Sequence, residues 1–223
     1  MYNYEIDFLD SCVEYFQATA NASLRLSFSG PSSSGKTACL SRLMLLLEQL
    51  PFSVELRPSI SRTHVKAVST TTQRSETFQQ QLFDEAVSEN LKMYCSNSQI
   101  QLYDRILLDG YVYVLNYGQM TASFLEQYAK AVFHEIQQLD YSILFQRAVF
   151  VDDGTRREFD KNFSDDFIRD FQKHWPCTET PLLILPKVIG IDDLYLSLLA
   201  TISHHLRERL KPTQMKQLRS SVS

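Results

Sequence analysis

The sequence carries the stretch Phe28-Ser29-Gly30-Pro31-Ser32-Ser33-Ser34-Gly35-Lys36-Thr37, an apolar strand end followed by the pattern G-x-x-x-x-G-K-T. Backbone N–H groups of such a glycine-rich turn can surround a polyphosphate, and the positive end of the next helix dipole points at it. In this pattern Lys36 reaches the β- and γ-phosphates, and the Thr37 hydroxyl holds Mg²⁺. The stretch therefore predicts a phosphate-binding loop for ATP and Mg²⁺.

The residues on both sides of the loop have the patterns that such a site requires. Before it, Leu24, Leu26 and Phe28 alternate with polar residues, which is typical of a short strand. After it, residues 38–48 contain no glycine or proline, which favours a helix. The order is thus strand, loop and helix. The predicted nucleotide-binding residues are Gly30, Pro31, Ser32, Ser33, Ser34, Gly35, Lys36, Thr37 and Ala38.

Helical and strand-like segments alternate from residue 23 to about residue 209, which predicts a parallel sheet covered by helices. We expect an α/β, three-layer P-loop NTPase fold with a five-stranded parallel sheet flanked by helices. Strands are predicted at residues 23–29, 52–57, 99–104, 147–152 and 181–186. Helices are predicted at residues 5–19, 36–50, 74–94, 109–119, 123–139, 164–175 and 191–209. Residues 1–210 are expected to form a single domain, and the polar, basic tail at 211–223 is expected to be disordered.

The composition is that of an ordinary globular protein. Of the 223 residues, 44% are hydrophobic and 22% are charged, and a net charge of −4 argues against a surface that coats DNA generally. The four cysteines lie far apart without a C-x-x-C spacing, so we expect reduced thiols in a cytoplasmic protein. We predict no signal peptide, no membrane-spanning segment and no particular oligomeric state.

A long polar stretch between residues 59 and 77 follows the second predicted strand and is rich in serine and threonine. Ligands of open α/β folds bind outside the carboxyl ends of the strands, which is the sheet edge that this stretch shares with the phosphate loop. Two interpretations are open. The stretch either binds an acceptor substrate that carries phosphate or hydroxyl groups, or it is a solvated surface loop.

A phosphate loop needs an acidic partner for magnesium, and residues 100–104 supply one. The run Ile100-Gln101-Leu102-Tyr103-Asp104 has the pattern of a strand that ends in an aspartate, which would lie beside Thr37 and orient Mg²⁺ or its water. Arg105 follows directly, and its guanidinium can bind a phosphate or substrate oxygen through two N–H groups. In an alternative interpretation residues 106–109 form the strand and Asp109 is the magnesium residue; we favour Asp104.

Residues 104–113 read D-R-I-L-L-D-G-Y-V-Y, which fits the pattern D-R-x-x-x-D-x-x-x-Y. This pattern resembles small P-loop ATPases and kinases such as the kinase domain of bacterial nicotinamide riboside kinase, and thymidylate and deoxynucleoside kinases carry related D-R or E-R motifs. Glu55 and Arg57 are similar to a segment that those proteins place beside the acceptor. Asp153-Gly154-Thr155-Arg156 resembles the start of their lid, where an arginine meets the transferred phosphoryl group.

The motifs and the resemblance together indicate ATP-dependent phosphoryl transfer to a nucleoside- or nucleotide-like acceptor. Thr37 and Asp104 are the expected magnesium ligands, and the expected catalytic residues are Lys36, Asp104, Arg105 and Arg156. Glu55 or Asp109 would accept or orient the acceptor's hydroxyl proton, and the expected acceptor-binding residues are Glu55, Arg57, Arg62 and Asp109. Two alternatives remain open: an ATPase switch or regulatory module that works with a partner protein, and a kinase that acts on DNA.

Overall fold

The structure is a computed structural model that describes residues 3–19, 23–65, 70–118, 120–146, 163–176 and 178–220. Within these residues one sheet is formed by five parallel strands, β1 (Leu24–Ser29), β2 (Val54–Arg57), β3 (Ile100–Asp104), β4 (Tyr141–Leu144) and β5 (Leu182–Ile184). The strand order is β2-β3-β1-β4-β5, so β2 and β3 lie on one side of β1, and β4 and β5, which come later in the sequence, lie on the other. Ligands of open α/β sheets bind at such a change of direction, beyond the carboxyl ends of the strands.

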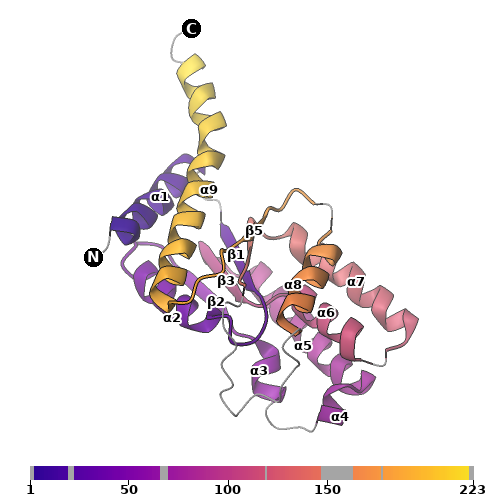
Figure 1. Cartoon of the computed structure of the whole chain (residues 1–223). Coiled ribbons are helices and arrows are strands. Elements are labelled where there is room, and N and C mark those ends of the chain that lie inside the picture. The colour runs from indigo at the N-terminus through magenta and orange to yellow at the C-terminus, as the bar shows by residue number, and fades with distance from the viewer. Residues whose placement is uncertain are drawn as a thin grey trace.

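Helices cover both faces of the sheet (Figure 1). One face is covered by α1 (Asn3–Thr19), α2 (Lys36–Leu47) and α9 (Ile191–Ser220). The other is covered by α5 (Glu76–Cys95), α6 (Leu107–Tyr117), α7 (Ala122–Gln137) and α8 (Phe163–His174). Two short helices, α3 (Ile60–Val65) and α4 (Thr70–Gln73), lie between β2 and α5. This arrangement confirms the predicted three-layer α/β fold with a five-stranded parallel sheet.

The two faces of β1 bury different side chains because strand residues point alternately to opposite sides, although each face of the sheet has an apolar core. On the α1, α2 and α9 side, Leu26 and Phe28 belong to an apolar core and are at most 1% exposed. The intervening Ser27 and Ser29 are completely buried, and the Ser27 hydroxyl donates to the Ser142 hydroxyl of β4 at 2.7 Å. The second face of β1 therefore carries hydrogen-bonding groups rather than a continuous apolar surface.

The structure differs from the predictions at β4 and after β2. The prediction of the fourth strand at residues 147–152 is wrong, because β4 is Tyr141–Leu144; residues 147–152 themselves lie outside the described residues. Apolar runs of strand length occur at both places, and the hydrophobic pattern alone does not choose between them. The polar stretch at 59–77 contains α3, α4 and the start of α5 instead of one long loop.

The last helix continues further than predicted. The sequence predicts a helix end near residue 209 and a disordered tail from residue 211, whereas α9 runs to Ser220 and extends beyond the body of the protein (Figure 1). Residues 214–219 are mostly good helix formers, which favours this continuation. The earlier part of α9 packs along α1, where Arg207 pairs with Asp7 at 2.8 Å. In the described residues, the helices are too short or too polar to cross a membrane.

Candidate functional site

The predicted phosphate-binding loop joins the carboxyl end of the central strand β1 to the first turn of α2. Gly30 (φ +141°), Ser33 (φ +59°) and Gly35 (φ +86°) have left-handed backbone conformations. A Cβ atom at Gly30 would lie 2.5 Å from the carbonyl oxygen of Phe145, and one at Gly35 would lie 2.6 Å from Cδ2 of Leu194. Both glycines of the motif are therefore required by backbone conformation and by close packing.

Lys36 is the first residue of α2, and its side chain folds back over the loop. The residue is only 4% exposed. Its ammonium donates to the carbonyl oxygens of Gly30 and Pro31, each at 2.7 Å, and to the hydroxyl of Ser34 at 3.0 Å. The positive charge thus lies within the turn, where it would neutralise a bound polyphosphate.

The two residues predicted to hold magnesium, Thr37 and Asp104, come from α2 and from the end of β3. Thr37 is exposed in the first turn of α2, and Ala38 next to it is exposed as well. Asp104 is the last residue of β3 and stands opposite Phe28 in the register between β3 and β1. A hydroxyl and a carboxylate are oxygen ligands of the type that Mg²⁺ prefers, so this pair fits the ion.

Asp109, predicted to contact the acceptor or magnesium, is instead part of the scaffold of the loop. The residue is 4% exposed on α6. Its Oδ2 atom accepts from the Ser29 hydroxyl at 2.6 Å and from the Ile106 amide at 3.0 Å. Its Oδ1 atom accepts from the Gly30 amide at 3.2 Å and from Nη1 of Arg105 at 3.1 Å. Four donors occupy the four lone pairs of the carboxylate, which leaves none for an acceptor hydroxyl or a metal ion.

Arg105 lies at the turn between β3 and α6 with its main chain and side chain both held. Its φ of +76° is in the left-handed region, which is costly for a residue other than glycine. Its amide donates to the carbonyl oxygen of Phe28 at 3.0 Å, and its carbonyl oxygen accepts from Nη2 of Arg57. The guanidinium remains 22% exposed while bonded to Asp109, so it can still contact a ligand.

Arg57, predicted to bind the acceptor, lies in a buried polar network. The residue is 4% exposed at the end of β2, and its Nη1 atom donates to Oδ1 of Asn90 at 2.5 Å. Glu135 of α7 is 1% exposed and lies 3.4 Å from Nη2 of Arg57. Its carboxylate accepts from the Asn90 amide at 2.7 Å and from the Leu107 backbone at 2.5 Å. Arg57 thus supports the turn that carries Arg105, and both of its Nη atoms are bonded within the scaffold.

The charge of Glu135 is balanced inside this network. Burial raises the pKa of the Glu135 carboxyl above its ordinary value, while the Arg57 guanidinium and the bonds from Leu107 and Asn90 act in the opposite direction. A buried ion pair of this kind depends strongly on both partners, because removal of one leaves an uncompensated charge.

The other predicted site residues lie elsewhere or outside the described residues. Glu55 accepts from the hydroxyls of Ser96 and Ser98, which precede β3, so it lies towards the amino ends of the strands, away from the loop. Arg62 belongs to α3, but its side chain lies outside the described residues. Arg156, with the whole segment that resembles a lid, also lies outside them.

Sequence reasoning missed Ser29, Asn90 and Glu135. Glu135 follows Tyr128 and Val132 at helical spacing, and all three are buried. An acidic residue on the apolar stripe of a predicted helix is therefore a signal that could have indicated a buried charge partner. Ser29 gives a weaker signal, because its inward direction follows only from the alternation of β1.

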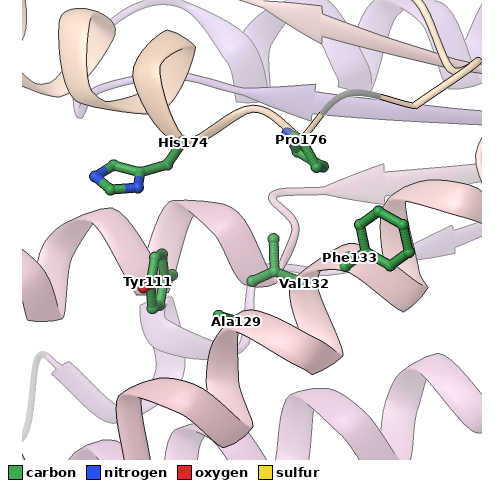
Figure 2. A pocket seen from close by; sticks show the side chains of 6 residues that line it. All are labelled: Tyr111, Ala129, Val132, Phe133, His174 and Pro176. Atoms are coloured by element: carbon green, nitrogen blue, oxygen red, sulfur yellow. The ribbon is translucent and has the colours of Figure 1, made fainter. Parts of the chain in front are cut away.

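A separate groove of about 210 Å³ lies among α6, α7 and the end of α8 (Figure 2). The imidazole of His174 faces the ring of Tyr111 edge-on, with 5.7 Å between ring centroids. The remaining lining is mainly apolar and comes from Ala129, Val132, Phe133 and Pro176. None of these lining residues is a predicted site residue, so the groove is distinct from the phosphate loop.

Solved structures that share this fold include a deoxyadenosine kinase, a thymidylate kinase and a NadR protein. A deoxyadenosine kinase from M. mycoides, solved with dCMP and dCDP, is 13% identical, with a TM-score of 0.56 over 81% of this chain and 100% of its own. Thymidylate kinase from Ehrlichia chaffeensis is 14% identical, with a TM-score of 0.55 over 81% of this chain and 99% of its own. A NadR protein in complex with NAD and AMP-PNP is 14% identical, with a TM-score of 0.60 over 86% of this chain and 51% of its own.

At this level of identity these likenesses show the fold, and they confirm the resemblance to the kinase group. Comparison with curated protein sequences gives no significant match. A family model described as an AAA domain matches residues 25–189, which include the phosphate loop, Asp104 and the five strands apart from Leu24, the first residue of β1. Because this match spans well over half of the sequence, the chain belongs to this AAA domain family of P-loop proteins.

Proposed function

We propose that this protein transfers the γ-phosphoryl group of Mg-ATP to a small nucleoside- or nucleotide-like acceptor. The observation that carries the proposal is that the phosphate loop and the Asp104-Arg105 motif both lie at the carboxyl ends of adjacent strands. The loop that contains Lys36 leaves β1, and Asp104-Arg105 ends the adjacent strand β3, with the Arg105 amide bonded to Phe28. Phosphoryl transfer depends mainly on positioning and charge neutralisation, and this edge supplies both.

The donor nucleotide would be held by the loop and by the start of α9. Lys36 and the loop amides would bind the β- and γ-phosphates. Thr37 and Asp104 would hold Mg²⁺, which supplies charge neutralisation between the phosphate oxygens. Ile189 and Ile191 are 87% and 42% exposed, and Ile191 Cδ1 lies 3.2 Å from the position of a Cβ on Gly35. They offer apolar surface for the base beside the phosphate site.

The acceptor would lie against Arg105 and α3. Arg105 supplies an exposed cation at the end of β3, and Arg156 is proposed to close over the transferred group as a lid arginine. Ser59 and Ser61, whose hydroxyl oxygens are 3.2 Å apart, can bond acceptor hydroxyls, and Arg62 on α3 is proposed to bind an anionic part. The carboxylate of Asp109 already accepts four hydrogen bonds, and Glu55 lies towards the amino ends of the strands. We therefore assign orientation of the acceptor hydroxyl to Asp104.

The test is a thin-layer assay with γ-labelled ATP against separate panels of nucleosides, mononucleotides and single-stranded DNA. Label is expected on one small acceptor, with ADP formed only when that acceptor is present. Lys36→Ala is expected to lower turnover at least about 100-fold. Lys130→Ala is the control, because Lys130 is 75% exposed on α7 and pairs with Glu126, one turn away on the same helix.

The outcomes separate the proposal from its alternatives. ADP and free phosphate formed without any acceptor indicate an ATPase module, and label on the oligonucleotide indicates a DNA kinase. Either result would reject transfer to a small acceptor. Full activity of the Lys36→Ala variant would reject the loop as the donor site.

A further inference from the structure

We propose that Asp109 is a positioning residue that sets the guanidinium of Arg105 against the first amide of the phosphate loop. The inference rests on the proposed function, because it concerns how that site is assembled. It differs from the roles predicted from the sequence, in which Asp109 contacts the acceptor or magnesium. In this assignment Asp109 touches no substrate and acts through Arg105.

One carboxylate oxygen links the two halves of the site. The Oδ1 atom of Asp109 accepts both from the Gly30 amide at 3.2 Å and from Nη1 of Arg105 at 3.1 Å. Two donors on one oxygen must be near neighbours, so the guanidinium lies beside the residue that opens the loop. Lys36 donates to the carbonyl oxygen of Gly30, so Lys36 bonds this residue directly and Arg105 is linked to it through Asp109.

The other carboxylate oxygen fixes Asp109 itself. Its Oδ2 atom accepts from the Ser29 hydroxyl at 2.6 Å and from the Ile106 amide at 3.0 Å. Ser29 belongs to β1 and Ile106 directly precedes α6, so the carboxylate joins strand and helix. Because the residue is 4% exposed, water competes little for these bonds. The orientation of Asp109 is therefore set before any ligand binds.

Arg105 needs such a support because its own backbone is strained. Its φ of +76° is sterically unfavourable for a residue with a Cβ atom. Arg57 holds the carbonyl oxygen of this residue from one side, and Asp109 holds its side chain from the other. A long arginine side chain that is 22% exposed would otherwise sample many rotamers. The support leaves the remaining N–H groups of Arg105 in a fixed place for a phosphate oxygen.

The test is a double-mutant cycle of wild type, Asp109→Asn, Arg105→Ala and the double variant, measured as kcat and as KM for the acceptor. Asparagine keeps the shape of the side chain but has one acceptor oxygen in place of two. We expect Arg105→Ala to lower kcat about 100-fold and Asp109→Asn about 10-fold or more. The double variant is expected to lie within about threefold of Arg105→Ala alone, since a positioning residue has nothing left to position.

A merely structural role predicts a different pattern. Independent effects would multiply to about a 1000-fold loss in the double variant, and that result would overturn the assignment. Asp109→Asn with kcat within twofold of wild type would overturn it too. Ser27→Ala is the control. It removes the buried hydrogen bond from Ser27 to Ser142 on β1, the strand that also carries Ser29, and it is expected to leave kcat within about twofold of wild type. If Asp109→Asn does not fold, Asp109→Ser replaces it in the same cycle.

A second readout separates this inference from the proposed function. The affinity of the same four proteins for a fluorescent ATP analogue with Mg²⁺ is measured without an acceptor. If wild type binds the analogue but labels no acceptor, the proposed function fails. The cycle in affinity still decides on Asp109, because Arg105 lies beside the loop. If the losses of affinity in the two single variants multiply in the double variant, the assignment is overturned. If the double variant binds the analogue about as tightly as Arg105→Ala alone, the assignment is supported.

Discussion

Replacement of Arg57 by methionine tests whether this residue belongs to the scaffold or to the acceptor site. Methionine has similar length but no charge. In the structure Arg57 donates to Asn90 and to the carbonyl oxygen of Arg105, and it faces Glu135 at 3.4 Å. The substitution removes all three interactions and leaves the Glu135 carboxylate at 1% exposure without its cation.

Arg57→Met is expected to lose a large part of the free energy of unfolding. Breaking a buried ion pair by removal of one partner costs about 3–5 kcal/mol, against a total free energy of unfolding of about 5–15 kcal/mol. A second substitution, Glu135→Gln, removes the uncompensated charge and is expected to restore at least about 1 kcal/mol in the Arg57→Met background. If Arg57 instead bound an acceptor at the surface, its replacement would change KM and shift stability by less than about 0.5 kcal/mol.

The pH dependence of the loss follows from the pKa of Glu135. Burial already raises this pKa above 4.5, and removal of Arg57 raises it further, since an opposite charge lowers the pKa of a carboxyl. A pKa that is higher in the folded state gives stability that is fully present below the unfolded value and is lost as pH rises through the folded value. The deficit of Arg57→Met should therefore be smaller near pH 5 than near pH 8.

Urea unfolding measures these free energies, with circular dichroism and the fluorescence of the single tryptophan, Trp175, as two probes. Coincident transitions from both probes establish that one free energy describes the change. Lysine at position 57 serves as a milder variant if methionine prevents folding. A loss below 1 kcal/mol for Arg57→Met, or a deficit independent of pH, would refute the buried network as the role of Arg57.

Three further predictions follow from the loop and the buried thiols. Gly35→Ala is expected to weaken binding of a fluorescent ATP analogue at least about 10-fold, because a Cβ would meet Leu194 at 2.6 Å with φ at +86°; unchanged affinity would contradict the loop geometry. In folded protein at pH 8, Cys95 should react with a thiol reagent far faster than Cys12 and Cys39, which mass spectrometry of the labelled peptides resolves. Burial raises the pKa of the Cys12 and Cys39 thiols to about 12, so the free energy of unfolding should fall as pH rises from about 9 towards 12. A urea midpoint that stays constant over this pH range would contradict the prediction.

The fold and the donor half of the site could be predicted because they rest on local patterns. The loop motif fixes the order of strand, turn and helix, and its glycines are needed at the positions where the structure has positive φ. Short apolar or alternating runs located β1, β2, β3 and β5 to within about two residues. The fourth strand could not be located in this way, because two apolar runs follow α7 and only pairing with β1 decides between them.

The roles of the charged residues near the strand ends could not be predicted, because they depend on the partners that each side chain bonds in the folded protein. Arg57 and Asp109 have the residue types of an acceptor site, yet both are 4% exposed and hydrogen-bonded to the scaffold. Glu135, which balances Arg57, is separated from it by 78 positions in the sequence. No local pattern connects positions so far apart, and only the packing of α7 against the end of β2 brings them together.

The turn at Arg105 explains why these buried charges are present beside an otherwise apolar core. A strained turn at Arg105 needs bonding partners on both sides, and an apolar layer under it would leave its carbonyl oxygen unsatisfied. Ser29 and Asp109 provide partners on the loop side, while Arg57, Asn90 and Glu135 provide them on the side of α5 and α7. The opposite face of the sheet, against α1, α2 and α9, has no such turn to support and is packed with apolar side chains. The buried polar groups around this turn are thus a consequence of holding one arginine beside a phosphate loop.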